Sequence, residues 1–435
     1  MKSFLIKNRI AAKLIDQEQE DFYQFLTASQ LTDSTVKQTV EKIINNVKKS
    51  GDEALFEYSN TFDRTNFTTS SDLLVSEKDI KESSEMLDKK VQDALKKAYK
   101  RIKDYHVKQL PKDFNFQDKQ GVELGNIWKS IQSIGVYVPG GTASYPSSVL
   151  MSAIPAIVAG VKDIVICAPT SAGKINPAIL FAAHLCGIKT IYKIGGAQAI
   201  AALTYGTQTI QKVNKIVGPG NAYVAAAKQM VFGEVGIDMI AGPTDLTIIA
   251  DKSANPSWIA ADLLSQLEHG ADSKAFIITD NEKFATRTLA EISVLSQNLK
   301  REDIIQKSLK NSAIFVINNL NDAPNLVNFI APEHLEIATN NPKKLLPAIE
   351  NAGAIFLGHY TPEAIGDYMA GPSHTLPTSS SATFSSGLSV FDFLKRISLI
   401  SCNKKSFMEL AEATSILADC EGLGAHKLSV DIRNN

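Results

Sequence analysis

The sequence predicts an α/β protein with two α/β units on mostly parallel sheets, together with N-terminal helices and a small helical C-terminal tail. Short β-branched runs, each closed by glycine or proline, alternate with alanine-rich helical stretches between residues 134 and 244. A second alternation of this kind runs from about residue 246 to about residue 389. Strand–helix–strand alternation implies a parallel sheet that helices cover on both faces.

The first hundred or so residues are rich in lysine and glutamate and have helical spacing. In the segment DSTVKQTVEKIINNVKKSGDEALFEYSNTFD, apolar side chains recur on one stripe of a helix. These side chains are Val36, Val40, Ile43, Ile44 and Val47. We expect Gly51 to end that helix and Asp52 to cap the next one.

The first α/β unit has five predicted strands, within IGVYVPGG, DIVICAP, KTIYKIGG, NKIVGPGN and IDMIAGPT. Ligands of parallel sheets bind just beyond the carboxyl ends of the strands. The residues at or just past those ends are Tyr137, Gly140, Gln198, Asn221 and Thr244. No Gly-x-Gly-x-x-Gly fingerprint is present. The nearest phrase, VGPGNAYV, could let a phosphate or ribose approach the backbone, but its glycines suit a ligand-free tight turn equally well.

The second α/β unit has predicted strands within SKAFIITD, SAIFVIN and GAIFLG. The serine-rich stretch LPTSSSATFSSGLS then predicts a loop or linker. The last 45 or so residues predict a small helical tail.

Composition indicates a soluble, cytoplasmic protein that works on small molecules. The 45 lysines and arginines nearly balance the 46 acids, so there is no excess positive field to hold nucleic acid. Four scattered cysteines, Cys167, Cys186, Cys402 and Cys420, form neither a disulfide framework nor a Cys-x-x-Cys knuckle. The most apolar stretch is broken by Pro155 and a Lys-Asp pair, so it cannot supply the roughly 20 residues that span a membrane. The N-terminus lacks the pattern of a secretory signal.

The polar residues that could carry chemistry gather in the second half of the chain. Five of the seven histidines lie there, and these are His269, His334, His359, His374 and His426. SWIAADLLSQLEHG predicts a helix ending at Gly270, with Gln266 and His269 on one face. That pair could bind a metal, or His269 could simply interact with carbonyls at the helix end.

Three further phrases pair an acid with a histidine. In APEHLEI, Pro332 is expected to begin a helical turn, so that Glu333 and His334 could be reactive or could form an ordinary charged first turn. GDYMAGPSHTLPT offers Asp367 and His374 in a glycine- and proline-rich loop. EGLGAHKLSV offers Glu421 and His426. Spacing alone does not join these phrases, because no His-Glu-x-x-His zinc motif is present.

Eight phrases together resemble histidinol dehydrogenases, in the order found in that family. They are GVYVPGG, IGGAQAIAAL, VGPGNAYVAAAK, DMIAGPTD, DLLSQLEHGADS, APEHLEI, GDYMAGPSH and EGLGAHK. The resemblance covers essentially the whole chain and implies two Rossmann-like, aldehyde-dehydrogenase-like domains. It also implies oxidation of L-histidinol to L-histidine through the bound aldehyde, in two steps that each consume one NAD, with one zinc ion per subunit.

The resemblance carries roles over to matching residues. It implies zinc ligands at Gln266, His269, Asp367 and His426, with His334 as the base and Glu333 as the activator of water. The implied substrate contacts comprise these six residues together with Thr244, His374 and Glu421. NAD would be lined by Tyr137, Gln198 and Asn221. The tail would place Glu421 and His426 in the site of a second subunit, so a homodimer is expected.

The same comparison suggests domain boundaries. Residues 1–27 would form an N-terminal helical segment, residues 28–136 and 246–388 the domain with metal and catalytic residues, 137–245 the NAD-binding domain, and 389–435 the helical tail. Two departures from the family pattern affect fine substrate contacts. Thr244 stands where family members often have serine. The phrase GPSH, which ends at His374, replaces a more usual GTNH.

Two rival chemistries fit parts of the sequence. An aldehyde dehydrogenase mechanism would need a nucleophilic cysteine, for which Cys167 could be proposed, although VICAP suits a packed strand end better. A zinc hydrolase would also use metal ligands beside a glutamate. It would have no need of Tyr137, Gln198 and Asn221 at strand ends.

Overall fold

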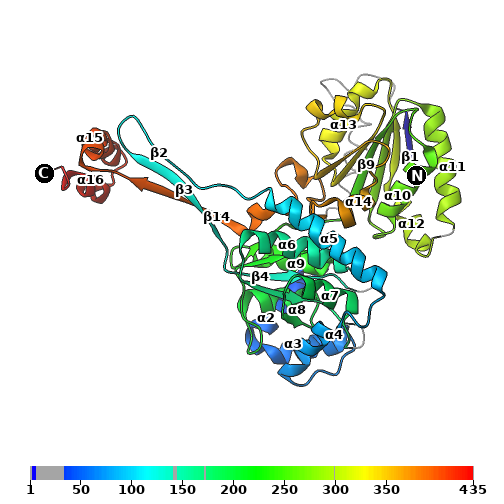
Figure 1. Ribbon diagram of the computed structural model, residues 1–435, viewed down its shortest axis with the longest axis horizontal. Coiled ribbons are helices and arrows are strands. Elements are labelled where there is room, and N and C mark those ends of the chain that lie inside the picture. The colour runs from blue at the N-terminus through cyan, green and yellow to red at the C-terminus, as the bar shows by residue number, and fades with distance from the viewer. Residues whose placement is uncertain (1, 6–33, 141–144, 171–172, 298, 435) are drawn as a thin grey trace.

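The computed structural model describes residues 2–5, 34–140, 145–170, 173–297 and 299–434, which form two α/β domains and a projecting arm (Figure 1). Most of the predicted N-terminal helical segment, residues 1–27, lies outside the described residues. Its described part is not helical, because Lys2–Leu5 form strand β1. This strand pairs in parallel with β11, more than 300 residues away. The local sequence of the N-terminal segment therefore could not reveal its pairing partner.

One domain is built on a five-stranded parallel sheet with the strand order β6-β5-β4-β7-β8. Its strands are β4 Ser133–Tyr137, β5 Asp163–Cys167, β6 Thr190–Tyr192, β7 Lys215–Val217 and β8 Gly236–Ile237. Its later helices are α6 Pro146–Ala159, α7 Pro177–Leu185, α8 Gly196–Tyr205 and α9 Ala222–Val231. Strands β4, β5, β6 and β7 match the predicted phrases to within one residue, so the first predicted α/β unit is confirmed. The fifth phrase, IDMIAGPT, shares only Ile237 with β8, and Thr244 therefore does not stand at a carboxyl end as expected but directly precedes β9 (Asp245–Ala250).

The N-terminal helices also belong to this domain. They are α2 Ser34–Ser50, α3 Asp52–Phe62, α4 Glu77–Glu82 and α5 Lys89–Val107. The apolar stripe of α2 packs with residues of α8 and α9 in one core, and α5 packs with α6 and α7 in another. Residues 28–136 were expected in the other domain, but helices α2 to α5 pack instead on the helices α6, α7, α8 and α9 that cover the first sheet.

The other domain has a six-stranded parallel sheet with the order β1-β11-β10-β9-β12-β13. Its later strands are β9 Asp245–Ala250, β10 Lys274–Thr279, β11 Ala313–Val316, β12 His334–Ala338 and β13 Ala354–Leu357. Its helices are α10 Pro256–Leu267, α11 Glu282–Ser296, α12 Glu302–Ser308, α13 Ala323–Ile330 and α14 Glu363–Ile365. Helices α10, α11 and α12 cover one face of the sheet and α13 covers the other. The prediction of a second parallel α/β unit is confirmed.

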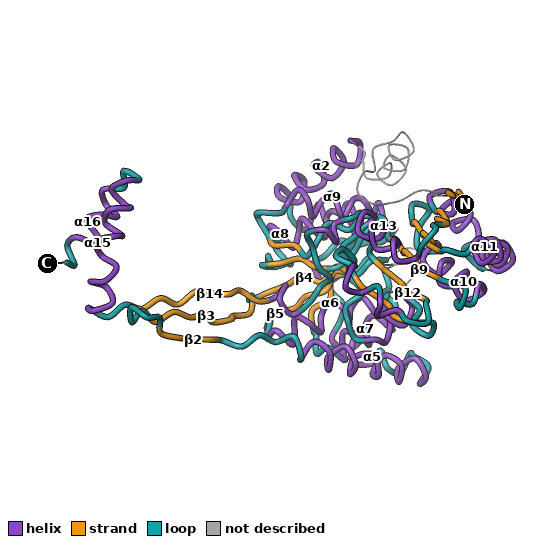
Figure 2. Tube along the Cα trace, turned by 90° about the horizontal axis from the view of Figure 1, so that it is seen from above, coloured by secondary structure: helices purple, strands orange, loops and turns teal. Residues whose placement is uncertain are grey.

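A three-stranded antiparallel sheet forms an arm that extends away from both domains (Figure 2). Its strands are β2 Phe114–Gln117, β3 Glu123–Ser130 and β14 Leu394–Ser401, and the arm ends in helices α15 Lys404–Cys420 and α16 Gly424–Asp431. The tail predicted as helical over residues 389–435 thus contains a strand. Its eight residues pair with β3, a partner about 270 positions earlier, which no local pattern reveals.

No helix among the described residues is long and apolar enough to cross a membrane.

Candidate active site

The catalytic candidates lie at the amino ends of two neighbouring strands, β9 and β12. Thr244 precedes β9, Glu333 precedes β12, and His334 is the first residue of β12, paired with Leu246 of β9. The expectation that Pro332 begins a helical turn is wrong. Helix α13 has already ended at Ile330, and the next segment enters the sheet as strand β12, between β9 and the edge strand β13.

Glu333 is buried and held by two donors. The hydroxyl of Thr244 donates to Oε2 of Glu333 at 2.5 Å, and the backbone N–H of Asp245 donates to the same oxygen at 3.2 Å. In return, the backbone N–H of Glu333 donates to Oδ1 of Asp245 at 3.0 Å. Burial, together with the nearby Asp245 carboxyl, raises the pKa of Glu333 well above its ordinary value.

In the described part of the chain, one ring nitrogen of His334 is hydrogen-bonded and the other is not. Its Nδ1 lies 3.2 Å from the backbone oxygen of Asp245, so this nitrogen carries the proton in the neutral ring. Its Nε2 is buried and has no hydrogen-bond partner among the described residues. Burial lowers the pKa of His334 to about 3, so the imidazole is neutral and Nε2 can accept a proton.

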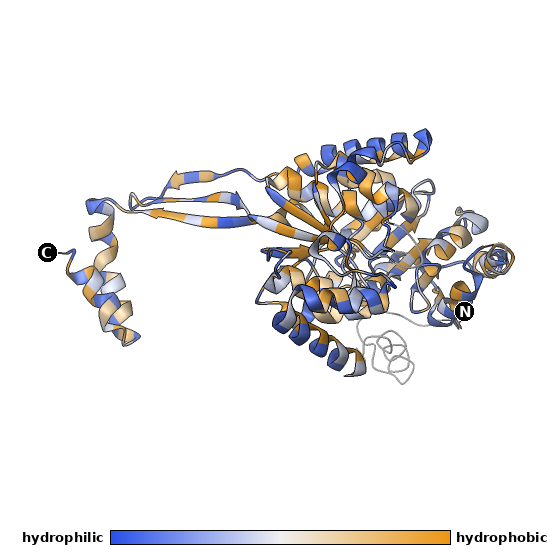
Figure 3. Ribbon diagram, turned by 90° about the horizontal axis from the view of Figure 1, so that it is seen from below, coloured by the Kyte–Doolittle hydropathy of each residue, from blue (hydrophilic) through white to orange (hydrophobic). Residues whose placement is uncertain are grey.

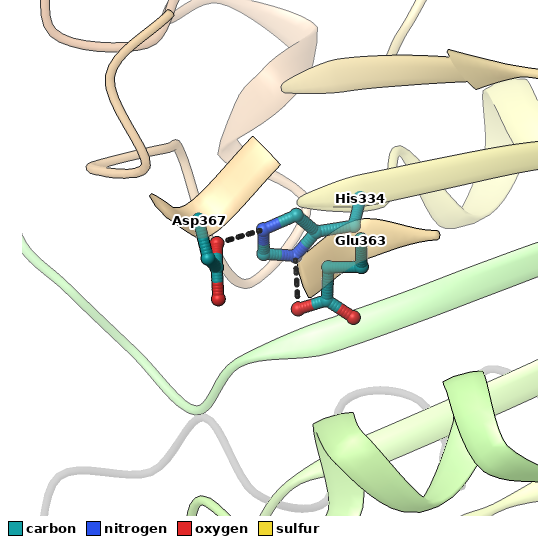
Figure 4. Close-up of side chains that lie close together, drawn as sticks. All are labelled: His334, Glu363 and Asp367. Atoms are coloured by element: carbon teal, nitrogen blue, oxygen red, sulfur yellow. Dashed lines mark ion pairs between the residues drawn. The ribbon is translucent and has the colours of Figure 1, made fainter. Parts of the chain in front are cut away.

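Two carboxylates flank His334 (Figure 4). Oε1 of Glu363 lies 3.6 Å from its Nδ1, and Oδ1 of Asp367 lies 3.9 Å from its Nε2. Glu363 begins α14, and Asp367 lies in the π-helical turn Gly366–Ala370 that follows. The three side chains offer ligand atoms within 4.8 Å of one another, which is close enough to hold a cation together.

Glu363 was missed by the sequence analysis. The phrase TPEAIGD places it four residues before Asp367, a spacing that puts two side chains on one face of a helical turn. That spacing was the available signal. Burial and the neighbouring carboxyls, Asp367 first among them, raise the pKa of Glu363 well above its ordinary value.

Gln266 lies fully buried in the last turn of α10, which ends at Leu267 and not at the predicted Gly270. Its amide is satisfied when the nitrogen faces the carboxylate of Glu363, with Oε2 at 2.9 Å, and the oxygen accepts at 3.0 Å from the backbone N–H of Asp245, a donor that it shares with Oε2 of Glu333. The opposite orientation would set the amide oxygen against the carboxylate of Glu363. Gln266 therefore links Glu363 to the segment at the amino end of β9 that also holds Glu333.

His269 and His374 complete the cluster from two loops. Nδ1 of His374 lies 3.2 Å from the backbone oxygen of Asp367, and its Nε2 lies 3.3 Å from the hydroxyl of Ser148 in the first turn of α6. Burial, together with the nearby His269, lowers the pKa of His374 to about 4. Ser148 is a second residue that the sequence analysis missed, and it links the site to the first sheet domain.

Glu421 and His426 are not brought to this cluster within one chain. Glu421 follows α15 and His426 lies in α16, and both side chains are exposed at the far end of the arm (Figure 1). The remaining predicted contacts, Tyr137, Gln198 and Asn221, lie at the carboxyl edge of the first sheet. Tyr137 ends β4 and accepts a hydrogen bond at its hydroxyl from the Gly196 N–H at 3.1 Å.

Gln198 and Asn221 begin two helices at this edge. Gln198 is buried in the first turn of α8, and the side chain of Asn221 caps α9 by accepting from the N–H groups of Tyr223 and Val224 at 3.1 Å each. Cys167 lies at the end of β5 with no exposed surface, and burial raises the pKa of its thiol far above the ordinary value. A thiol held protonated in this way is a poor nucleophile.

Two parallel α/β domains with a buried cluster of histidines and carboxylates at the edge of one sheet define a two-domain α/β protein with an enzyme-like site. The family model for histidinol dehydrogenase matches residues 26–434. The chain is 50% identical over 418 residues to histidinol dehydrogenase of Agrobacterium fabrum strain C58, covering 96% of each chain. It is 46% identical over 404 residues to the enzyme of Hydrogenovibrio crunogenus, covering 93% of each. The chain belongs to the histidinol dehydrogenase family.

A solved structure agrees with this assignment. Histidinol dehydrogenase from Elizabethkingia anophelis superposes with a TM-score of 0.93 at 36% identity, covering all of this chain and 98% of that one. The resemblance stated from the sequence is therefore confirmed.

Proposed function

We propose that this chain oxidises L-histidinol to L-histidine through L-histidinaldehyde, as a cytoplasmic, zinc-containing, NAD-dependent histidinol dehydrogenase of histidine biosynthesis. Family membership supports the reaction. The observation that carries it is the ring of His334, with Nδ1 tied to a backbone oxygen and Nε2 buried without a partner. A ring so oriented has one nitrogen ready to accept a proton.

His334 acts as the general base in the first step. The hydroxyl proton of histidinol passes to Nε2, and a hydride leaves the carbon that bears this hydroxyl, so the alcohol becomes an aldehyde. NAD, when bound, accepts that hydride. Burial keeps the imidazole uncharged, so the lone pair of Nε2 is unprotonated before the reaction, and the Asp367 carboxylate 3.9 Å away would stabilise the charge that the ring gains with the proton.

Glu333 activates the water that hydrates the aldehyde. Its carboxylate is fixed by Thr244 and by the Asp245 N–H, next to His334 in the chain. The raised pKa of Glu333 makes its carboxylate a stronger base towards water than an exposed glutamate. The hydrate then supplies a second hydride by the route of the first.

Gln266, His269 and Asp367 would hold zinc, together with His426 of a second copy. The residues present fit a cation: the buried carboxyl of Glu363 and the part-buried carboxyl of Asp367 repel each other, and a positive charge would relieve that repulsion. Zinc supplies a positive centre for the imidazole and amine nitrogens of the substrate and favours loss of the hydroxyl proton. His374, Thr244 and Glu421 of the second copy would contact the substrate.

The carboxyl edge of the first sheet would bind NAD through Tyr137, Gln198 and Asn221. The hydrogen bond between His374 and Ser148 supports this, since it joins the catalytic cluster to the helix that follows β4. A cofactor at that edge would therefore face the substrate.

A homodimer would complete each site. The arm carries its end residues away from their own domains, and hydrophobic residues occur along its strands and helices (Figure 3). Many of the large hydrophobic side chains there are exposed. The most exposed include Ile400, Leu428 and Ile432. An arm of this form suits insertion against a second copy, since exposed apolar patches mark association surfaces.

The test is to mix zinc-loaded protein with NAD and L-histidinol and follow NADH absorbance. We expect two NADH for each histidine formed, identified by amino-acid analysis. A protein that holds zinc and binds NAD but forms no NADH would contradict the proposal, and hydrolysis of an amide or ester without NADH would favour the hydrolase.

A further inference from the structure

A buried ion pair lies beneath the edge of the first sheet. The side chain of Lys228 on α9 is only 2% exposed, and that of Asp238, which follows β8, is 0% exposed. Nζ of Lys228 bonds to Oδ1 of Asp238, and the same ammonium donates to the backbone oxygen of Gly218 at 3.0 Å. None of the residues already placed in the reaction belongs to this pair.

The ion pair hydrogen-bonds to both the backbone N–H and the backbone oxygen of Gly218. Oδ2 of Asp238 accepts a hydrogen bond from the N–H of Gly218 at 2.7 Å, while Lys228 binds its carbonyl oxygen. Oδ1 of Asp238 also accepts from the N–H of Met239 at 2.6 Å. Charge-assisted bonds of this kind are stronger than neutral ones, so the conformation of Gly218 is held from two sides.

Gly218 is the point where the turn after β7 contacts β4. Its φ of +111° lies in the region that favours glycine, and a Cβ there would collide with the backbone oxygen of Tyr137. Three residues later, Asn221 caps α9. The ion pair therefore sets the path of the turn between two of the residues proposed to bind NAD.

A buried ion pair contributes little net stability, since the cost of desolvating both charges offsets their attraction. Its geometric effect is more definite. The turn has a glycine at each side of Pro219, so without the pair its backbone would have more freedom than an ordinary turn. Fixing a binding loop before the ligand arrives reduces the entropy lost on binding.

We propose that Lys228 and Asp238 are positioning residues for the dinucleotide, holding the Gly218 turn in the conformation to which NAD binds. The inference rests on the proposed function, because it takes NAD to lie at this edge of the sheet. Neither side chain would touch NAD itself.

The first experiment measures NAD and L-histidinol binding to Lys228→Met/Asp238→Asn by calorimetry on the zinc-loaded protein. Removing both charges avoids leaving one buried and unpaired. We expect the Kd of NAD to rise about tenfold, with the Kd of L-histidinol and kcat at saturating NAD within about twofold of wild type. An unchanged Kd of NAD, or an equal loss for both ligands, would overturn the inference.

Lys215→Met is the matched control. Lys215 is the first residue of β7, the strand that leads into the Gly218 turn, and its Nζ pairs with Oδ1 of Asp392 at 3.5 Å. We expect NAD affinity to be unchanged in this variant. A tenfold loss there as well would assign the effect to the strand as a whole and contradict a specific role for Lys228 and Asp238.

A second measurement needs no variant to fold. In the NAD-free wild type the backbone N–H of Gly218 should already exchange slowly, because Asp238 holds it before NAD binds, and exchange there at the rate of an unstructured peptide would overturn the inference. Asn221→Ala separates the two levels of argument. If this variant leaves the affinity for NAD unchanged, the proposed NAD site is wrong. If it weakens NAD binding while the Lys228→Met/Asp238→Asn variant does not, only the positioning role is wrong.

Discussion

Nδ1 of His334 lies 3.6 Å from Oε1 of Glu363, although one residue begins a strand and the other begins a three-residue helix 29 positions later. The contact brings a third acid to a ring that already lies beside Glu333 and Asp367. It raises a question of roles, since His334, Glu363 and Asp367 could themselves hold a cation.

Replacing His334 by glutamine distinguishes a base from a metal ligand. As a base, His334 contributes a proton acceptor, so we expect kcat to fall by about 10²–10⁴-fold while zinc content is unchanged. Rapid-quench kinetics and metal analysis would measure both. His359→Gln, a histidine in the same domain that bonds to Ser253, is the control. Loss of zinc from the His334 variant would instead place this ring in the coordination shell.

Replacing His269 by asparagine should remove zinc. An imidazole is a strong zinc ligand and a carboxamide a weak one, so we expect at least a tenfold weaker zinc affinity in a chelator competition and correspondingly low turnover. Retained zinc with full activity would contradict the proposed ligand set.

Mixing two inactive variants tests whether sites are shared between subunits. His334→Gln and His426→Asn chains, unfolded together and refolded, would form some dimers in which one site has both intact residues. We expect about a quarter of wild-type activity from random association of chains, by the symmetry of two shared sites. Refolding each variant alone provides the baseline. No recovery, with wild-type chains recovering normally, would favour a site within one chain.

Replacing Cys167 and Cys186 by serine should leave turnover near wild type. Cys167 is buried and Cys186 is part-buried, and desolvation raises the pKa of each thiol, to about 12 for Cys186. Neither is therefore poised as a thiolate. A loss of more than about 10²-fold in kcat from a folded variant, as expected for a lost nucleophile, would revive the covalent route.

Asp63→Asn should raise stability above pH 6 and leave it unchanged near pH 4. Burial raises the pKa of Asp63 from 3.8 to about 6, so the folded protein binds a proton that the unfolded chain has lost. Stability from this group therefore falls as pH rises from about 4 to 6. After allowance for its partial exposure we expect a gain of about 1 kcal/mol at pH 8, or about 1 °C in Tm. An equal shift at both pH values would contradict a titration effect.

Local patterns determined the first sheet and the covering helices. Its β-branched runs end in glycine or proline, and its strands are buried on both faces, so each is recognisable without its neighbours. The apolar stripe of α2 likewise marks a helix wherever it packs. Eight ordered phrases were enough to indicate the family, and the comparisons confirmed it.

Strand β12 was misread because its burial is tertiary in origin. HLEIA carries a histidine and a glutamate, yet all five residues are buried between β9 and β13. Oε1 of Glu336 is accommodated there by accepting from the N–H of Glu363 at 2.7 Å. No local pattern reports a partner 27 positions away.

What the sequence by itself determined is the two α/β units, the helical faces and the set of residues from which the site is drawn. Only the tertiary structure decided which sheet the N-terminal helices cover, that residues 394–401 pair as a strand, and that Glu363 and Ser148 join the site. The reason is that periodicity and turn residues act over a few positions. Pairing, burial and the sharing of hydrogen bonds depend instead on segments that meet only when the chain has folded.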